Sequence, residues 1–206
     1  MRCYLVRHAQ TAWNDENRLQ GHSDPALSPR GVEQAERLGA YFGLVSNGGR
    51  VRHVYTSHLR RSQKTAEAIA SRIGAVPVIE PSLAEIHLGA WEGLTPEEVD
   101  ARFEGAYQRW RLVPSSVTIP GGEPVEAFRA RVRRVLTQLI SAHRDVDEAL
   151  VIVSHGGVIA AWLADSLGAD YDRLLHRVAI DNAGISALDC TLDPPRVLWV
   201  NATTHL

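Results

Sequence analysis

The chain has 206 residues, of which 45% are hydrophobic and 22% charged, a composition typical of globular proteins. This length supports one sizeable core and is too short for two comfortable domains, so we expect a single domain over residues 1–206. Lysine and arginine total 22 against 24 acidic residues, and the resulting charge of −2 excludes a general attraction to nucleic acid or anionic lipid.

Two cysteines, Cys3 and Cys190, are too few for a disulfide framework or a four-ligand metal site. Both lie in apolar, strand-like runs, where a small buried thiol is the ordinary state, although one bridge between them stays open. The sequence shows no basic-then-apolar leader and no apolar run of membrane-spanning length. We therefore expect a cytoplasmic protein.

The first predicted element is a buried strand at Tyr4 to Val6 that ends in Arg7 and His8. Its apolar run, bounded by a polar loop, is typical of a buried strand. Taken alone, Arg7 and His8 would be interpreted as two polar surface residues at the end of a strand. A second run of the same kind, over residues 149–154, leads into His155. Because strands of open α/β sheets present functional groups at their carboxyl ends, the two runs together favour a binding site.

A long polar loop over residues 9–28 follows the first strand, and loops of this length tend to be functional or disordered. Ser28 and Pro29 then predict a helix start, as the N-cap and the first helical residue. Asn47-Gly48-Gly49 is expected to end this helix. Its apolar stripe consists of Val32, Ala35, Leu38, Phe42 and Val45.

The rest of the chain also alternates between strand-like and helix-like segments. We expect strands at 54–56 and 76–79, helices over 59–73, 125–142 and 156–167 and from Thr95-Pro96, an irregular stretch over 113–124, and closing strands at 184–190 and 196–200. Helix 156–167 is apolar nearly all round and should be buried, whereas the four arginines of helix 125–142 are expected on a solvated face. This order predicts an α/β fold, a three-layer sandwich with a mostly parallel central sheet flanked by helices.

Side chains suited to binding an anion stand in four separated segments: Arg7-His8, Arg61, Glu85 in the loop 82–94, and His155-Gly156. Arginine presents a planar fork of donors that matches phosphate or carboxylate oxygens. A helix N-terminus adds backbone N–H groups, and both Arg61 and Gly156 stand at predicted helix starts directly after strands. Together these features predict a pocket for a doubly negative group.

At these positions the chain resembles the histidine phosphatase superfamily, the phosphoglycerate mutase-like group. The resemblance spans almost the whole chain and rests on five motifs in order. They are Leu5-Val6-Arg7-His8-Ala9-Gln10-Thr11-Ala12-Trp13-Asn14, the stretch from Leu27 to Ala35, Thr56-Ser57-His58-Leu59-Arg60-Arg61-Ser62-Gln63-Lys64-Thr65-Ala66, Leu83-Ala84-Glu85 with Gly89-Ala90-Trp91-Glu92-Gly93, and Val153-Ser154-His155-Gly156-Gly157.

The resemblance implies a role for each residue of this set. His8 is the expected nucleophile, which becomes a phosphohistidine, and Glu85 the expected general acid and base. Phosphoryl oxygens are expected to contact Arg7, Arg61, His155 and the further donor Asn14. Thr11, Gln20, Gly21 and the helix start at Gly156 complete the expected substrate contacts. Since the arginines and His155 supply positive charge, the resemblance implies no metal and no cofactor.

Several residues compete for these roles or leave two interpretations open. Arg60 competes with Arg61, and Glu92 with Glu85, and the motif register favours Arg61 and Glu85. His87 is a rim contact or a structural histidine. The pair His22 and Asp24 is poor support for a metal site. Trp91, Trp110 and Tyr107 either wall the leaving-group pocket or pack in the core or on the surface.

One position departs from the family pattern, because Ala9 stands where glycine is usual. If the backbone there needs a positive φ, alanine costs about 1 kcal/mol. The departure bears on the subfamily more than on catalysis.

The resemblance favours the phosphatase branch over the mutases. The interval before the last catalytic strand is short and carries Ile119-Pro120-Gly121-Gly122-Glu123-Pro124 in place of the paired basic residues of mutases. We expect a cap-like insertion around 91–124 and a small phosphomonoester substrate, whose leaving group the sequence does not specify. A cofactor-dependent phosphoglycerate mutase is the alternative, and a non-catalytic phospho-ligand binding protein is a further one. A homodimer is expected only because dimers are common.

Overall fold

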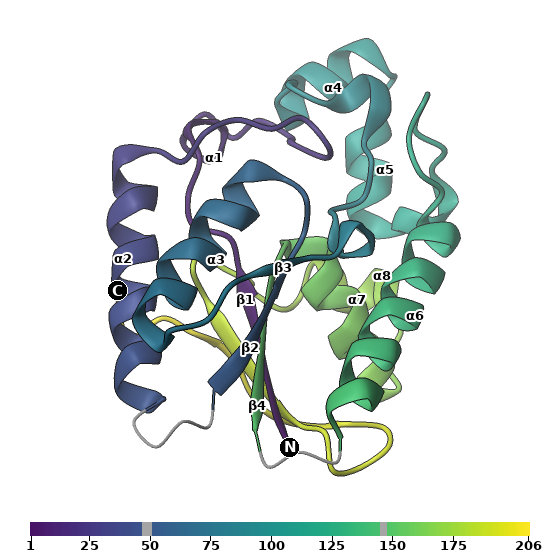
Figure 1. The fold of residues 1–206 in the computed structure, drawn as a ribbon. Coiled ribbons are helices and arrows are strands. Elements are labelled where there is room, and N and C mark those ends of the chain that lie inside the picture. Colours follow the sequence, from purple (N-terminus) through teal and green to yellow (C-terminus); the bar gives the residue numbers. More distant parts are fainter. Residues whose placement is uncertain (47–50, 145–147) are drawn as a thin grey trace.

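The computed structural model describes residues 1–46, 51–144 and 148–206. In these ranges the strands form one six-stranded sheet in the order β3-β2-β4-β1-β5-β6 (Figure 1). The strands are β1 (Arg2–Arg7), β2 (Val51–Thr56), β3 (Val78–Ile79), β4 (Ala149–Ser154), β5 (Ile185–Asp189) and β6 (Arg196–Ala202). The first four run parallel to one another, and β5 and β6 are antiparallel to their neighbours. The predicted α/β fold with a mostly parallel sheet is confirmed.

Helices cover both faces of this sheet and extend beyond one of its ends. Helices α2 (Pro29–Val45) and α3 (Arg60–Ile73) lie against one face, and α6 (Val125–His143) and α7 (Gly156–Leu167) against the other (Figure 1). The shorter elements are α1 (Ala12–Asp15), α4 (Pro96–Arg102), α5 (Ala106–Leu112), α8 (Tyr171–Leu175) and the 3-10 turns Pro81–Leu83, Gly89–Trp91 and Pro114–Ser116. No helix in the described ranges is long and apolar enough to cross a membrane.

The core consists of two layers separated by the sheet. Along β1, Cys3 and Leu5 pack on the α6 and α7 side, and Tyr4 and Val6 on the α2 and α3 side. This alternation follows from the two-residue period of a strand. Since both faces are covered, every residue of β4 is buried. Cys3 and Cys190 are both buried free thiols, as expected.

The structure corrects several expectations drawn from local pattern. The polar loop after β1 contains the helix α1, because Thr11 accepts from the Asn14 amide as its N-cap. The stripe predicted for α2 is too wide, since Val32 is 48% and Val45 40% exposed. The expected helix end at 47–49 lies outside the described residues. Helices α5 and α8 have no counterpart among the predicted elements, and β3 covers only half of 76–79.

Strand register brings the distant motifs together. Arg7 pairs with Ser154, and Thr56 pairs with Val153, so the three strands β1, β4 and β2 end at the same level. The residues that follow these ends, His8, His155 and Ser57, therefore meet at one edge of the sheet.

Candidate active site

His8 follows β1 and is 3% exposed. Its Nδ1 lies 2.8 Å from the carbonyl oxygen of Ala9, and because a carbonyl only accepts, Nδ1 carries the proton. The Nε2 lone pair is then free to attack an electrophile. Burial first, and then the charges of Arg61 and Arg7, hold the pKa of His8 well below its ordinary value. The imidazole is therefore neutral, as a nucleophile must be.

Two arginines place positive charge near His8, and each donates hydrogen bonds to backbone carbonyls. Arg61, in the first turn of α3, is 1% exposed and donates to the carbonyls of Ser23 and Gly21, each at 2.7 Å. Burial lowers the pKa of Arg61 to about 10, so it stays charged at neutral pH. Arg7 donates to the Ile180 carbonyl at 2.6 Å. In each guanidinium the buried Nε has no partner within the described residues.

His155 faces His8 across the site, with ring centroids 5.2 Å apart. Its Nε2 lies 2.8 Å from the Ser57 hydroxyl, whereas its buried Nδ1 has no partner within the described residues. With the hydroxyl proton of Ser57 assigned to Nε2, Nδ1 carries a hydrogen and is a donor. Burial, followed by the charge of Arg61, lowers the pKa of His155 well below its ordinary value, so the expectation that His155 supplies positive charge is wrong and the arginines supply it.

Glu85 reaches the site from the segment after β3. Its carboxylate accepts from the backbone amide of Ile86 at 2.9 Å and from that of Gly157 at 3.0 Å. The start of α7 therefore binds this carboxylate through Gly157, and a side chain at Gly157 would collide with it. The resemblance implies a substrate contact for Gly156 at this helix start, which stays a prediction. The contact with Glu85 is made by Gly157, and a Cβ added at Gly156 would meet Arg7 Nε at an ordinary 3.7 Å.

Arg7, His8, Arg61, Glu85 and Gly157 line one cavity of about 280 Å³, whereas the predicted contacts His155 and Gly156 are not among its lining residues. Of the other expected substrate contacts, Asn14, Gln20 and Gly21 line it too. Thr11 is fully buried and donates to Asn14 Oδ1 at 3.0 Å, so it supports that side chain and does not line the cavity. Because Asn14 Oδ1 also accepts from Asn182, its amide nitrogen remains available to donate to an anion.

The structure distinguishes the competing residues. Arg60 is exposed, whereas Arg61 is buried in the cavity wall. Glu92 accepts from the amides of His22 and Ser23, each at 2.8 Å, and so fixes the loop that carries Gly21. Burial alone would raise the pKa of Glu92, but the hydrogen bonds from these amides lower it. Glu92 is therefore a loop anchor.

Two further histidines near Glu85, His22 and His87, contact other groups of the protein. His22 Nε2 donates to the Glu85 carbonyl at 2.8 Å, and His87 lies 3.5 Å from a Glu92 oxygen with its side chain 41% exposed. No cluster of three or more His, Cys, Asp or Glu suited to a metal occurs in the described ranges. Ala9 has no positive φ, so the departure from glycine there carries no strain.

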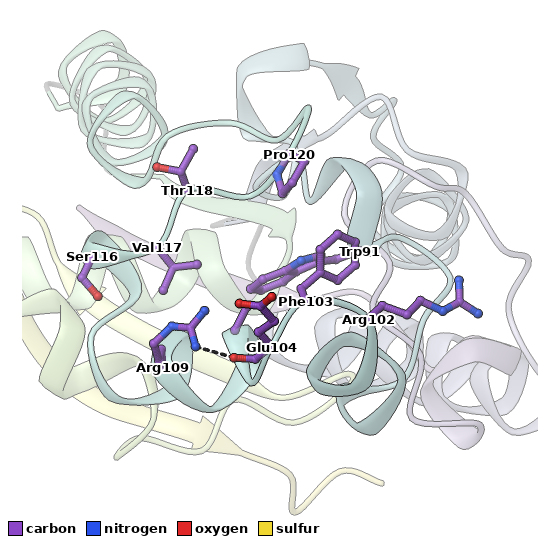
Figure 2. Close-up of a pocket in the computed structure, with 10 residues that line it drawn as sticks. Trp91, Arg102, Phe103, Glu104, Arg109, Ser116, Val117, Thr118 and Pro120 are labelled. Carbon is purple, nitrogen blue, oxygen red and sulfur yellow. Dashed lines mark hydrogen bonds between the residues drawn. The ribbon is translucent and has the colours of Figure 1, made fainter.

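A second cavity, of about 410 Å³, lies in the segment predicted as a cap (Figure 2). Trp91 and Phe103 lie together at its centre, and Arg109 donates to the Glu104 carbonyl at its edge (Figure 2). Trp91 is 1% exposed and does not line the cavity beside His8. Tyr107 and Trp110 do line it, and they stack on each other with centroids 5.9 Å apart.

Sequence reasoning missed three residues that support the site. Ser57 stands directly after β2, so the same strand-end rule that identified His155 would have found it. Gly157 follows Gly156 in the motif, and only the contact with Glu85 distinguishes the two. Arg131 is one of the four arginines assigned to a solvated face, yet it bonds to the segment that carries Glu85. Nothing in its position along the predicted helix indicates this contact.

The fold and this edge of the sheet define an α/β protein in which two arginines and a glutamate line a cavity beside a buried histidine. The family described as the histidine phosphatase superfamily (branch 1) matches residues 3–203, and the chain belongs to it. It is 36% identical over 157 residues to phosphoglycerate mutase-like protein 4 of Arabidopsis thaliana, an alignment that covers 75% of this chain and 66% of that protein.

Two further relatives align over nearly their full length. Phosphoserine phosphatase 1 of Hydrogenobacter thermophilus is 32% identical over 202 residues, covering 98% of this chain and 92% of that protein. The mycobacterial glucosyl-3-phosphoglycerate phosphatase in complex with VO3 has a TM-score of 0.85 and 30% identity, covering 98% and 99% of the two chains. The superfamily and these relatives together support a phosphatase enzyme.

Proposed function

We propose that the chain hydrolyses a small phosphomonoester through a phosphohistidine on His8. One observation carries this proposal. Around His8, the buried nitrogens Arg7 Nε, Arg61 Nε and His155 Nδ1 lack partners among the described residues. Unpaired buried donors are costly, and the oxygens of a phosphoryl group would accept from all three.

In the first step the Nε2 lone pair of His8 attacks phosphorus, and the bond from phosphorus to the ester oxygen breaks. The carboxyl proton of Glu85 passes to that oxygen, so the product leaves as an alcohol. Arg7, Arg61 and His155 hold the charge on the other oxygens, which is the main assistance that a protein can give to phosphoryl transfer.

In the second step a water molecule attacks the phosphorus of the phosphohistidine. Its proton passes to Glu85, and the bond from phosphorus to His8 Nε2 breaks, which releases inorganic phosphate. Both side chains return to their starting forms. Arg7 and Arg61 supply the positive charge in both steps, so we propose metal-independent hydrolysis, with full activity expected after dialysis against EDTA.

The leaving-group end of the cavity suits an apolar leaving group better than one that carries a carboxylate. Apart from the groups around His8, most of the cavity is lined by apolar and aromatic side chains, with Asn17, Arg18 and Gln20 as the polar ones, and we take this part as the leaving-group end. The apolar and aromatic residues are Trp13, Leu19, Ile86, Leu88, Tyr107, Trp110, Tyr171 and Leu175. Among the described lining residues, the one cation at this end is Arg18, which is bound to Glu16 at 2.7 Å and to Glu98 at 3.2 Å. A carboxylate placed here would lose its hydration without gaining a free counter-ion. This disfavours a phosphoglycerate mutase.

Rapid quenching tests the proposal. During turnover of p-nitrophenyl phosphate, protein quenched in alkali should carry phosphate that mild acid releases, as a phosphohistidine does. Wild-type protein that releases phosphate but never carries an acid-labile group would contradict the intermediate. Faster conversion of 3-phosphoglycerate to 2-phosphoglycerate than release of phosphate would favour the mutase. Tight binding of phosphate esters with no turnover would favour a binding protein.

A further inference from the structure

Arg131, on helix α6, lies outside the catalytic cavity, yet its whole guanidinium is hydrogen-bonded to other groups of the protein. Its Nε and Nη2 donate to the two carboxylate oxygens of Glu123, at 3.0 and 2.7 Å. Its Nη1 donates to the carbonyls of Ser82 and Ala84, at 2.8 and 2.9 Å, and its Nη2 to that of Glu85 at 3.3 Å. These five bonds match the five N–H groups that an arginine has.

The Pro-Gly-Gly-Glu turn places the partner of this arginine. The Glu123 amide donates to the His87 carbonyl at 2.8 Å, and the Ala90 amide donates to the Pro120 carbonyl at 2.9 Å. At Gly89, which has a φ of +47°, a side chain would collide with the backbone of the turn. The turn and the segment after Glu85 are therefore packed backbone to backbone, which fixes the Glu123 carboxylate beside Arg131.

The backbone that carries Glu85 is thus held at each carbonyl. Besides the three bonds from Arg131, the Leu83 carbonyl accepts from the Ser154 hydroxyl at 2.7 Å, and the Glu85 carbonyl accepts from His22 at 2.8 Å. The Glu85 carboxylate itself is hydrogen-bonded to backbone amides. The position of its Cα, and so the reach of the carboxyl group, depends on the held segment.

We propose that Arg131, paired with Glu123, is a positioning residue that sets the distance from the Glu85 carboxyl group to the leaving oxygen. This inference rests on the proposed function. Proton transfer requires heavy atoms at hydrogen-bond distance, so a shift of about 1 Å in the segment lowers the rate of a step that needs Glu85. Lysine, with three donors on one nitrogen, cannot form the five bonds of the guanidinium.

Two esters that differ in their need for an acid test this role. An alkyl phosphate requires a proton on its leaving oxygen, whereas 2,4-dinitrophenyl phosphate leaves as a stable anion. In single-turnover phosphorylation, Arg131→Lys and Glu123→Gln should slow the alkyl ester between about 10- and 100-fold and the dinitrophenyl ester by less than about 3-fold. Arg134→Lys, at an exposed position on the same helix, is the matched control and should change neither rate.

Adding Arg131→Lys to Glu85→Gln should cause almost no further loss, because the arginine acts through the carboxyl group. Equal slowing of both esters, no slowing, or a full further loss in the double variant would overturn the inference. Vanadate affinity and thermal midpoint report whether the phosphate end and the fold persist. If Arg131→Lys does not fold, the ester ratio of Glu123→Gln decides alone. Failure of the wild type to form a phosphoenzyme would instead reject the proposed function.

Discussion

The two ends of the catalytic cavity are built from different kinds of structure. At the phosphate end the side chains come from strand ends and a first helical turn, and His8, Arg61 and His155 are each at most 3% exposed. At the other end, Trp13 and Trp110 come from the short helices α1 and α5 and are only half-buried. Strand pairing fixes the first end, whereas connecting segments shape the second. We therefore expect mutations to alter substrate preference easily, whereas the type of reaction should be hard to change.

The largest effect is expected at the centre of the phosphate end. His8→Asn removes the proposed nucleophile, and kcat should fall on the order of 10⁴-fold or more with every ester, whatever its leaving group. Phosphate release from an alkyl and an aryl ester measures this. Vanadate binding should survive, because the arginines remain. Activity within about 10-fold of wild type would mean that another group attacks phosphorus.

Gly157→Ala is expected to show how little room the phosphate end allows. The new Cβ would occupy the place of a Glu85 carboxylate oxygen, so the carboxylate must move. We expect kcat for an alkyl phosphate to fall about 100-fold, within the range of general acid catalysis. Gly156→Ala is the matched control, since its Cβ would meet Arg7 Nε at 3.7 Å. Equal losses in the two variants would contradict the assignment.

Acid should destabilise the phosphate end in particular. The pKa values of His8 and His155 lie well below that of an unfolded histidine because burial, first, disfavours their charged forms. Below about pH 6.5 the unfolded chain therefore binds more protons than the folded one, and the free energy of unfolding falls as the pH falls toward the folded pKa values. Each histidine contributes up to about 1.4 kcal/mol per pH unit.

Urea unfolding at about pH 7, 6 and 5 measures this slope. Replacing His8 by asparagine should remove its share, so the variant should lose less stability than the wild type between about pH 6.5 and 5. A slope that is unchanged in the variant would show that His8 binds protons equally in both states.

The same contrast explains what the sequence could predict. Strand-end logic applies to the phosphate end, so residue types and their spacing along the chain are enough to bring Arg7, His8 and His155 to one place. It fails for contacts made across the fold. Arg131 has the pattern of a solvated helix face, and Trp91 stands near Glu85 in sequence yet packs behind Tyr107 and Trp110 without lining the cavity. Such contacts depend on how loops pack, which period and propensity do not encode.

The smallest effect, and the one that separates the two ends most sharply, is expected at Trp110. Trp110→Ala removes an indole that lines the leaving-group end and stacks on Tyr107. For 2-phenylethyl phosphate kcat/KM should fall about 10-fold, the scale of one lost apolar contact, and for methyl phosphate it should hardly change. The two alcohols leave with similar ease, so their ratio reports binding of the leaving group. Phe103→Leu, in the neighbouring cavity, should leave that ratio unchanged. Parallel losses for both esters in Trp110→Ala would mean that the cap segment also shapes the phosphate end, and that the division between the two ends is wrong.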